Sequence, residues 1–229
     1  MNYSHVIFCG DSYMKCYVDS DGPRQLCDKL KAIPVTMVRS GSSHEYVLRR
    51  IYNEVITKPR CLVVWGLTHV FRTEYPVKGR WLTLNYDRIM RDDGEPGYED
   101  RDLTDTLIAT NALNIDNLNL YMEWSLQQMD MLGRWLLSEG HDFLIFNQCC
   151  TDYAKIADRD WPVLLSIRKQ KRFYRIFDWY MNQHLHESGV GVRPADRHFF
   201  SRDFALPMHP LEGQLLADTV NDFILERLR

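Results

Sequence analysis

The sequence predicts a single three-layer α/β domain in which helices cover both faces of a central, mostly parallel sheet. Three observations lead to this prediction, and the first two are short apolar runs without alternation and amphipathic segments between them. Continuous apolar runs are typical of parallel strands covered on both faces, and their alternation with helices favours βαβ units. The third observation is a length of 229 residues with 45% hydrophobic residues, from which we expect one domain over residues 1–229.

Four apolar runs are expected to form the strands, in the order Val6–Cys9, Val35–Val38, Cys61–Trp65 and Phe143–Phe146. Segments with helical periodicity separate or follow them, over Pro23–Leu30, Ser43–Ile56, Asp116–Ser138, Lys169–His186 and Pro210–Leu228. The segment 116–138 has the clearest period, and we expect Asp116 to cap its start and Gly140 to stop it.

Residues 73–112 interrupt this alternation. They are rich in Asp, Arg, Gly and Tyr and contain the charged run Arg91–Asp102, which predicts an exposed loop insertion. A second irregular stretch, Gly189–Pro207, leads to His209. We expect the insertion to shape the pocket of the site described next.

The overall charge argues against strong attraction to nucleic acid or to a membrane surface. The chain has 28 basic and 31 acidic residues and a formal net charge of -3. No stretch approaches the ~20 consecutive apolar residues that span a bilayer, and the start of the chain does not resemble a signal peptide. The six cysteines show no CxxC spacing, which favours reduced thiols in a cytoplasmic protein over disulfides or zinc.

The strongest local motif is Gly10-Asp11-Ser12, directly after the first predicted strand. A serine at the carboxyl end of a buried parallel strand lies where α/β folds bind ligands, and the start of the next helix favours negative charge. Ser12 is therefore a candidate nucleophile. The alternative is that Asp11 and Ser12 only form a turn and cap the helix.

Two further turns are expected at the same edge of the sheet, because parallel strands present their carboxyl ends together. In Ser40–Ser43, Gly41 allows a close backbone approach and an oxyanion-binding N–H, while Ser42 or Ser43 can cap the following helix. After the third strand come Thr68, His69 and Arg72, which would line the same crevice. An ordinary turn and solvated side chains are the alternative interpretation.

His209-Pro210 directly precedes the last predicted helix. Proline suits the first helical turn, so His209 would lie at the mouth of that helix, where a base for Ser12 is needed. A structural histidine is the alternative.

Taken in order, these four motifs resemble the block pattern of the SGNH (GDSL-like) hydrolase superfamily, from residue 6 to about residue 220. The resemblance implies an SGNH or flavodoxin-like sheet and a serine esterase that needs no metal or other cofactor. Its substrate would be a small-molecule or glycan ester, such as an O-acetylated carbohydrate or another short-chain acyl ester.

The resemblance also implies a role for each motif. Ser12 would attack the carbonyl carbon, and His209 would accept the serine proton. Backbone N–H groups of Ser12 and Gly41 would hold the oxyanion, and Thr68 stands where the family has asparagine. The remaining residues expected at the substrate are Asp11, His69 and Arg72.

Two positions depart from the family's pattern. Leu206 stands three residues before His209, where the family has the aspartate that orients the histidine, so Asp203 is the candidate orienting carboxylate. Gly66–His69 reads GLTH where the family has GxND. Loss of one oxyanion donor costs on the order of a hundredfold or more in turnover.

Two other hypotheses stay open, the first because of these departures and the second because backbone N–H groups of Gly10–Ser12 and Ser40–Ser43 could hold a phosphate, as in a nucleotide-binding protein. One is a catalytically degenerate binding or structural protein, similar to SGNH-like proteins of bacteriophages, that would use the loop Arg91–Asp102 and the aromatic residues Tyr75, Trp81 and Tyr98. The other is a phosphate-binding, flavodoxin-like protein. It has less support, because the sequence contains no Walker lysine and no GxGxxG fingerprint.

Overall fold

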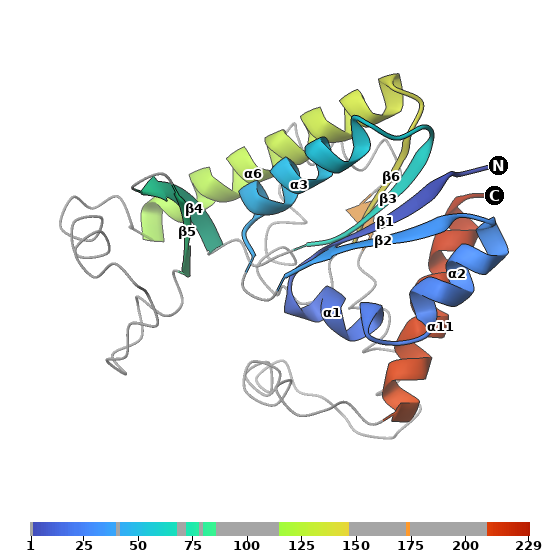
Figure 1. Ribbon diagram of the computed structural model, residues 1–229. Helices are drawn as coiled ribbons and strands as arrows, with labels where there is room; N and C mark the ends of the chain where they lie inside the picture. Colours follow the sequence, from blue (N-terminus) through green and yellow to red (C-terminus); the bar gives the residue numbers. More distant parts are fainter. Residues whose placement is uncertain are drawn as a thin grey trace.

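Figure 1 shows the computed structural model of the protein, which describes residues 2–39, 42–67, 72–77, 80–85, 115–146, 173–174 and 210–229. Five of the described strands form one sheet in the order β2 (Ile33–Val38), β1 (His5–Gly10), β3 (Cys61–Gly66), β6 (Asp142–Phe146) and β7 (Phe173–Tyr174). Every pairing between neighbours is parallel. The order 2-1-3 followed by later strands is that of doubly wound, flavodoxin-like sheets. The four strands predicted from the sequence are confirmed as strands, but β2 lies at the edge of the sheet and is largely exposed, so the expectation that it is covered on both faces is wrong.

Helices cover both faces of this sheet, as Figure 1 shows. On one face lie α3 (His44–Val55) and α6 (Ile115–Ser138). On the other lie α1 (Ser12–Val18), α2 (Gly22–Leu30) and α11 (Pro210–Arg227). The predicted three-layer α/β architecture is therefore confirmed.

The central strands contribute side chains to two separate hydrophobic cores, one on each face of the sheet. In β1, Ile7 and Cys9 face α3 and α6, whereas Val6 and Phe8 face the opposite helix layer. All four side chains are fully buried. Successive side chains of a strand point to opposite faces, and here both faces are covered. This double coverage explains why the run VIFC contains no polar position.

A polar cluster closes the amino ends of β1, β3 and β6. The Tyr3 hydroxyl donates to Oδ2 of Asp142 over 2.7 Å, and Nη2 of Arg60 lies 3.1 Å from the same oxygen. The Arg60 guanidinium also lies over the Tyr3 ring, 5.2 Å from its centroid. Burial, followed by the hydrogen bond to Asp142, raises the pKa of Tyr3. This cluster ties the three strand starts together at the end of the sheet away from Ser12.

The helix ends follow the capping signals, with one correction. Ser43 precedes α3, and its side-chain oxygen accepts the backbone N–H of Tyr46 over 3.2 Å, as an N-cap should. Gly140 has a φ of +80° just after α6 ends, which confirms it as the stop. Asp116 is not the N-cap of α6, because the helix already includes Ile115. An acidic residue is also favoured inside the first turn, so the two positions look alike in the sequence.

Two segments differ from the expected pattern. The helix predicted over 169–186 is wrong at Phe173–Tyr174, which form β7 and pair with Ile145 and Phe146 of β6. Aromatic residues suit a pleated strand as well as a helix. The rest of 169–186 lies outside the described residues.

The stretch predicted as an insertion, 73–112, contains regular structure. β4 (Arg72–Val77) and β5 (Arg80–Asn85) pair as an antiparallel hairpin. Arg49 of α3 holds this hairpin, because its Nη1 lies 2.6 Å from Oε2 of Glu74 and its guanidinium lies 4.1 Å from the centroid of the Trp81 ring. Residues 86–112 lie outside the described part of the chain.

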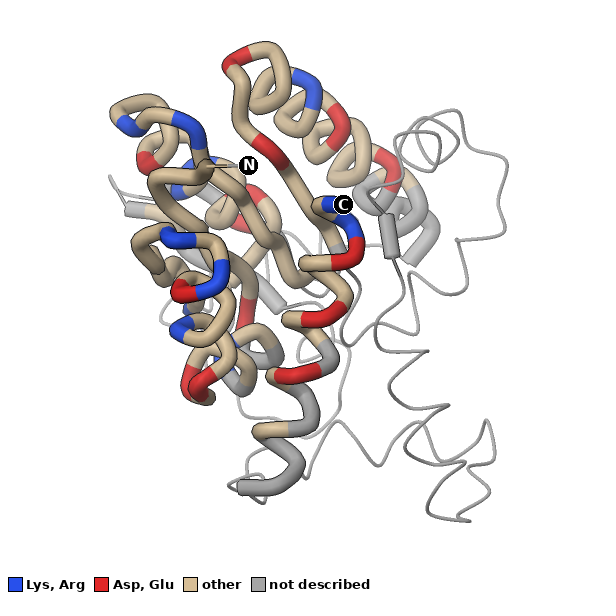
Figure 2. The backbone as a smooth tube through the Cα atoms, turned by 90° about the vertical axis from the view of Figure 1, so that its right-hand side faces the viewer, with Lys and Arg blue, Asp and Glu red and all other residues tan. Residues whose placement is uncertain are grey.

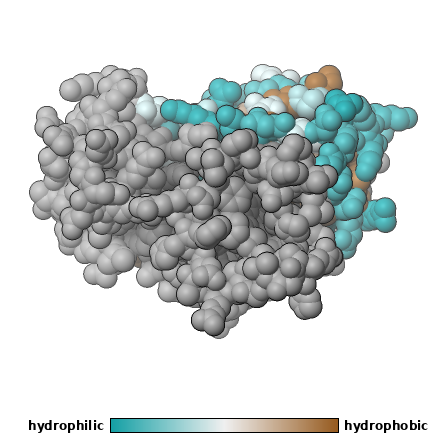
Figure 3. Space-filling view, turned by 90° about the horizontal axis from the view of Figure 1, so that it is seen from below, coloured by the Kyte–Doolittle hydropathy of each residue, from teal (hydrophilic) through white to brown (hydrophobic). Residues whose placement is uncertain are grey.

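The described helices carry charges of both signs. Figure 2 shows that the charged residues along α11 are acidic up to its basic carboxyl end. In Figure 3 the described atoms are mainly hydrophilic, with a few apolar groups among them. Among the described residues, no helix combines the length and the apolar character needed to cross a bilayer.

Candidate active site

The carboxyl ends of β1, β2 and β3 meet at one edge of the sheet. Gly10 of β1 is in register with Val38 of β2, and Cys9 with Trp65 of β3. After β1 the chain continues into α1, which covers one face of the sheet. After β3 it leads to α6, which covers the other face. In doubly wound folds, such a change of face between neighbouring strands opens the crevice in which ligands bind.

Ser12 begins α1 at this edge, two residues after the last residue of β1. Between them lies Asp11, whose carbonyl oxygen accepts the backbone N–H of Lys15 over 3.1 Å and so starts the helical hydrogen bonding. The Asp11 residue is fully buried. Asp11 therefore occupies the residue position before α1, where its carbonyl oxygen accepts the first helical hydrogen bond. Capping by its side chain and its contact with a substrate both stay predictions.

Gly10 brings the ends of β1 and β3 into close contact. Its φ is +148°, and a Cβ atom at this position would lie 2.6 Å from the carbonyl oxygen of Gly66 and 2.9 Å from Cβ of Met14. No side chain fits between these atoms, so only glycine allows α1 to start this close to β3. The steric role of Gly10 was not predicted, although a glycine at a strand end is the signal for such an approach.

Ser42 links the turn after β2 to the end of β1. Its hydroxyl donates to the carbonyl oxygen of Gly10 over 3.0 Å, and the backbone N–H of Arg39 donates to the same oxygen over 3.3 Å. Ser42 is buried. The Gly10 carbonyl thus connects two of the motifs singled out in the sequence. Ser42 was expected only as a possible helix cap, a role that belongs to Ser43.

Three buried rings, of His44, Trp65 and Phe143, pack together next to this turn. The His44 ring meets the Trp65 ring edge-on, with centroids 5.8 Å apart and planes at 84°. Phe143 of β6 lies on the indole as well, at 6.1 Å between centroids. Both His44 and Trp65 are buried. Edge-to-face pairs of this kind stiffen a core, so the start of α3 is held firmly against the end of β3.

Two buried thiols, Cys9 near this edge and Cys27 near the end of α2, have raised pKa values that disfavour nucleophilic chemistry. Cys9 lies one residue before Gly10, and its thiol is buried and directed to the carbonyl oxygen of Val64 at 3.4 Å. Burial raises the pKa of Cys9 well above its ordinary value. Burial, helped by Asp28, also raises the pKa of Cys27 to about 12. Because the thiolate is the reactive form, a raised pKa disfavours reaction at these two thiols. Within the described residues, no three His, Cys, Asp or Glu side chains gather to hold a metal ion.

The structure places part of the predicted site. It brings the backbone of Ser12, the end of β3 at Gly66 and the Ser42 turn to one edge. Arg72 is the first residue of β4, in register with Asn85. His209 directly precedes Pro210, the first residue of α11. Outside the described residues lie Gly41, Thr68, His69, Asp203 and His209, whose roles stay predictions.

Comparison with known proteins adds similarities of structure. No protein-family model matches the chain, and no curated protein matches its sequence. The chain is similar to the acetyl xylan esterase AlAXEase, with 14% identity over 94% of this chain and 97% of the other and a TM-score of 0.47. It is similar to a lipase/acylhydrolase from Enterococcus faecalis, with 12% identity over 99% and 97% of the two chains and a TM-score of 0.44.

A third solved structure with similarity is a GDSL-like lipase from Bacteroides thetaiotaomicron, with 9% identity over 76% of this chain and 69% of the other and a TM-score of 0.39. Likenesses at these identities and TM-scores do not establish an activity. The activity of this chain has to be argued from its own residues.

Proposed function

We propose that this chain is a serine hydrolase of the SGNH type that cleaves an acyl ester through Ser12 and His209. The observation that carries the proposal is the position of Ser12, which begins α1 at the carboxyl edge of the sheet, where β1 and β3 lead to opposite faces. Doubly wound folds bind ligands at this place. A nucleophile here would meet a substrate that enters the crevice.

The surroundings of Ser12 support this assignment because they are rigid. Gly10 packs against Gly66, and its carbonyl oxygen accepts hydrogen bonds from Ser42 and Arg39. Catalysis requires the reacting groups to be held within about 0.5 Å of their productive positions. A turn that served only to cap a seven-residue helix would not need this tight support from two neighbouring strands.

The proposed reaction proceeds in two steps. The Ser12 oxygen bonds to the ester carbonyl carbon while His209 takes the serine proton, and the C–O bond to the alcohol then breaks as His209 returns that proton to the leaving oxygen. Water repeats the sequence on the acyl-serine and releases the acid. Backbone N–H groups of Ser12 and Gly41, with the Thr68 hydroxyl, would bind the oxyanion. Asp203 would orient His209.

The substrate proposed is an ester with a short acyl group, such as an O-acetylated glycan. Asp11, His69 and Arg72 would contact its polar part. Since histidine ordinarily has a pKa of about 6.5, activity should rise as the pH passes upward through that region.

The test is labelling of the folded protein with a fluorophosphonate, which reacts with activated serines, followed by mass spectrometry. We expect an adduct on Ser12 in the wild type and none in Ser12→Ala. Ser138→Ala is the matched control, because its hydroxyl is exposed and donates to the carbonyl oxygen of Trp135, 2.8 Å away. It should label like the wild type.

The outcomes separate the proposed hydrolase from the alternative. No adduct and no turnover of short-chain acyl esters by a folded protein would reject the hydrolase. Glycan binding that survives Ser12→Ala without hydrolysis would favour a degenerate binding or structural protein, of the kind the sequence resembles in bacteriophages.

We also propose a cytoplasmic location. Cys9, Cys27 and Cys61 are free and buried, as suits a reducing compartment. Fractionation of the source cells with an antibody to the chain tests this.

A further inference from the structure

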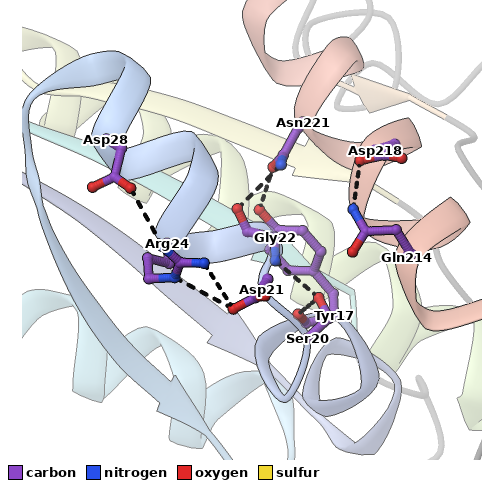
Figure 4. A network of polar contacts seen from close by, with 9 residues as sticks. All are labelled: Tyr17, Ser20, Asp21, Gly22, Arg24, Asp28, Gln214, Asp218 and Asn221. Carbon is purple, nitrogen blue, oxygen red and sulfur yellow. Dashed lines mark hydrogen bonds and ion pairs between the residues drawn. The ribbon is translucent and has the colours of Figure 1, made fainter. Parts of the chain in front are cut away.

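A buried hydrogen bond joins the helix that begins at Ser12 to the helix that follows His209. The Tyr17 hydroxyl on α1 donates to Oδ1 of Asn221 on α11 over 2.7 Å, as Figure 4 shows. Tyr17 is fully buried and Asn221 is 1% exposed. Burial raises the pKa of Tyr17, so its phenol stays protonated and remains a donor.

Asn221 makes a second buried contact on the same helix layer. Its Nδ2 donates to the carbonyl oxygen of Gly22, at the start of α2, over 3.1 Å (Figure 4). One amide therefore bridges three helices. Each of its two functions, acceptor and donor, has a partner on a different helix. A shift of α11 along its axis, or a rotation about it, would break one bond or the other.

The junction of α1, α2 and α11 around Gly22 is closely packed. A Cβ atom on Gly22 would lie 2.5 Å from Cε2 of Tyr17 and 2.9 Å from Cβ of Ala217 on α11. α1, α2 and α11 thus touch through a glycine, with the Asn221 bridge beside it. Interiors packed at this density transmit displacements instead of absorbing them.

The chain order connects this junction to the proposed site. Tyr17 lies five residues after Ser12 on the same helix, about 7.5 Å along its axis. Asn221 lies eleven residues after Pro210, the residue that follows His209. α1 is continuous from Ser12 to Tyr17, and α11 is continuous from Pro210 to Asn221. The relative position of the two helices at the Tyr17–Asn221 bond therefore also fixes the relative position of their first residues.

We propose that Tyr17 and Asn221 are positioning residues that set the placement of His209 relative to Ser12. This inference rests on the proposed function. Neither residue touches substrate; the hydrogen bond acts through the two helices. Its loss should misplace the base by a fraction of an ångström or more and slow the chemical step while the fold persists.

The experiment compares Tyr17→Phe with Tyr3→Phe. Both changes remove a phenol hydroxyl that donates over 2.7 Å to a side-chain oxygen, but Tyr3 lies at the amino end of the sheet. For both variants, kcat, KM, the rate of fluorophosphonate labelling at Ser12 and the thermal midpoint are measured. We expect Tyr17→Phe to lower kcat and the labelling rate on the order of tenfold, with KM nearly unchanged. Tyr3→Phe should lower only the thermal midpoint.

Each result decides the inference. If the wild type labels and Tyr17→Phe reacts as fast as Tyr3→Phe, the positioning role is overturned and the hydrolase stands. If the folded wild type neither labels nor turns over esters, the proposed function falls and the positioning role falls with it. If Tyr17→Phe is unfolded at the assay temperature, Asn221→Ser replaces it, because the shorter side chain withdraws from the same bond. An unchanged kcat in that variant also overturns the inference.

Discussion

Ser42 donates its hydroxyl hydrogen to the carbonyl oxygen of Gly10 over 3.0 Å, and both residues are buried. This bond joins the turn after β2 to the end of β1, two segments that are 32 residues apart in the sequence. It holds the backbone that leads into Ser12.

Ser42→Ala is expected to lower the free energy of unfolding by about 1 kcal/mol, since a buried hydrogen bond is lost while the Arg39 N–H still donates to Gly10. It should also slow labelling of Ser12. Ser138→Ala removes a hydroxyl-to-carbonyl bond of similar length at an exposed site, and should change the stability little. Urea unfolding of the two variants checks this. Equal losses of stability would count against the special role of the Ser42 bond.

Gly10→Ala should destabilise the protein strongly, by about 3 kcal/mol or more, because strain at a positive φ adds to a clash with backbone. The new Cβ would lie 2.6 Å from the carbonyl oxygen of Gly66. Gly140→Ala isolates the backbone term. Gly140 also has a positive φ, but nothing lies within 4 Å of its Cβ position, so a loss of about 1 kcal/mol is expected. Chemical denaturation of both variants measures the difference, and similar losses would refute the packing argument.

His141 should make the fold sensitive to mild acid. Its Nδ1 accepts the backbone N–H of Cys61 over 3.0 Å, which requires a neutral nitrogen. Burial lowers the pKa of His141, against the opposing charges of Glu139 and Asp142. The unfolded chain therefore binds the proton more readily. The stability contributed by His141 is complete above its unfolded pKa of about 6.5 and is lost as the pH falls toward the lower folded value.

The matched variant for this prediction is His141→Asn, in which Oδ1 can replace the acceptor without titrating. Urea unfolding of both proteins at several values between about pH 7.5 and 5 should give a steeper loss for the wild type. Parallel pH dependences would show that His141 is not the group responsible.

Arg49→Met should loosen the β4–β5 hairpin. Arg49 contacts the buried carboxylate of Glu74 and the face of Trp81, and its side chain is 35% exposed. We expect the free energy of unfolding to fall by about 2 kcal/mol and amide exchange in 72–77 and 80–85 to become faster, because Met removes the cation that faces the buried Glu74 carboxylate. Arg24→Met is the control. Arg24 pairs with Asp21 and Asp28 at the surface, where ion pairs contribute little. Unchanged exchange in the hairpin after Arg49→Met would contradict this prediction.

Local pattern in the sequence was enough to predict the layered fold. The runs at 6–9, 35–38, 61–65 and 143–146 became neighbouring parallel strands. The runs 6–9 and 61–65 are buried on both faces and contain no polar residue, whereas the edge strand β2 is largely exposed and includes Thr36. A covering helix needs an apolar stripe, which also leaves a local trace in the sequence. The placement of Ser12 at the carboxyl edge followed from the same pattern, since a parallel sheet puts these strand ends together.

Tertiary structure alone decided the contacts between distant segments. The sequence carries no local mark that Ser42 bonds to Gly10, that Gly10 must clear the carbonyl oxygen of Gly66, or that Asn221 bridges Tyr17 and Gly22. The sequence predicts a helix at Phe173–Tyr174, where the structure has β7, for a related reason. Two aromatic residues suit a helix or a strand equally, and here the pairing with β6 decides for the strand. Periodicity reports which side of an element is buried. It does not report which buried partner lies opposite, because that depends on how whole layers pack.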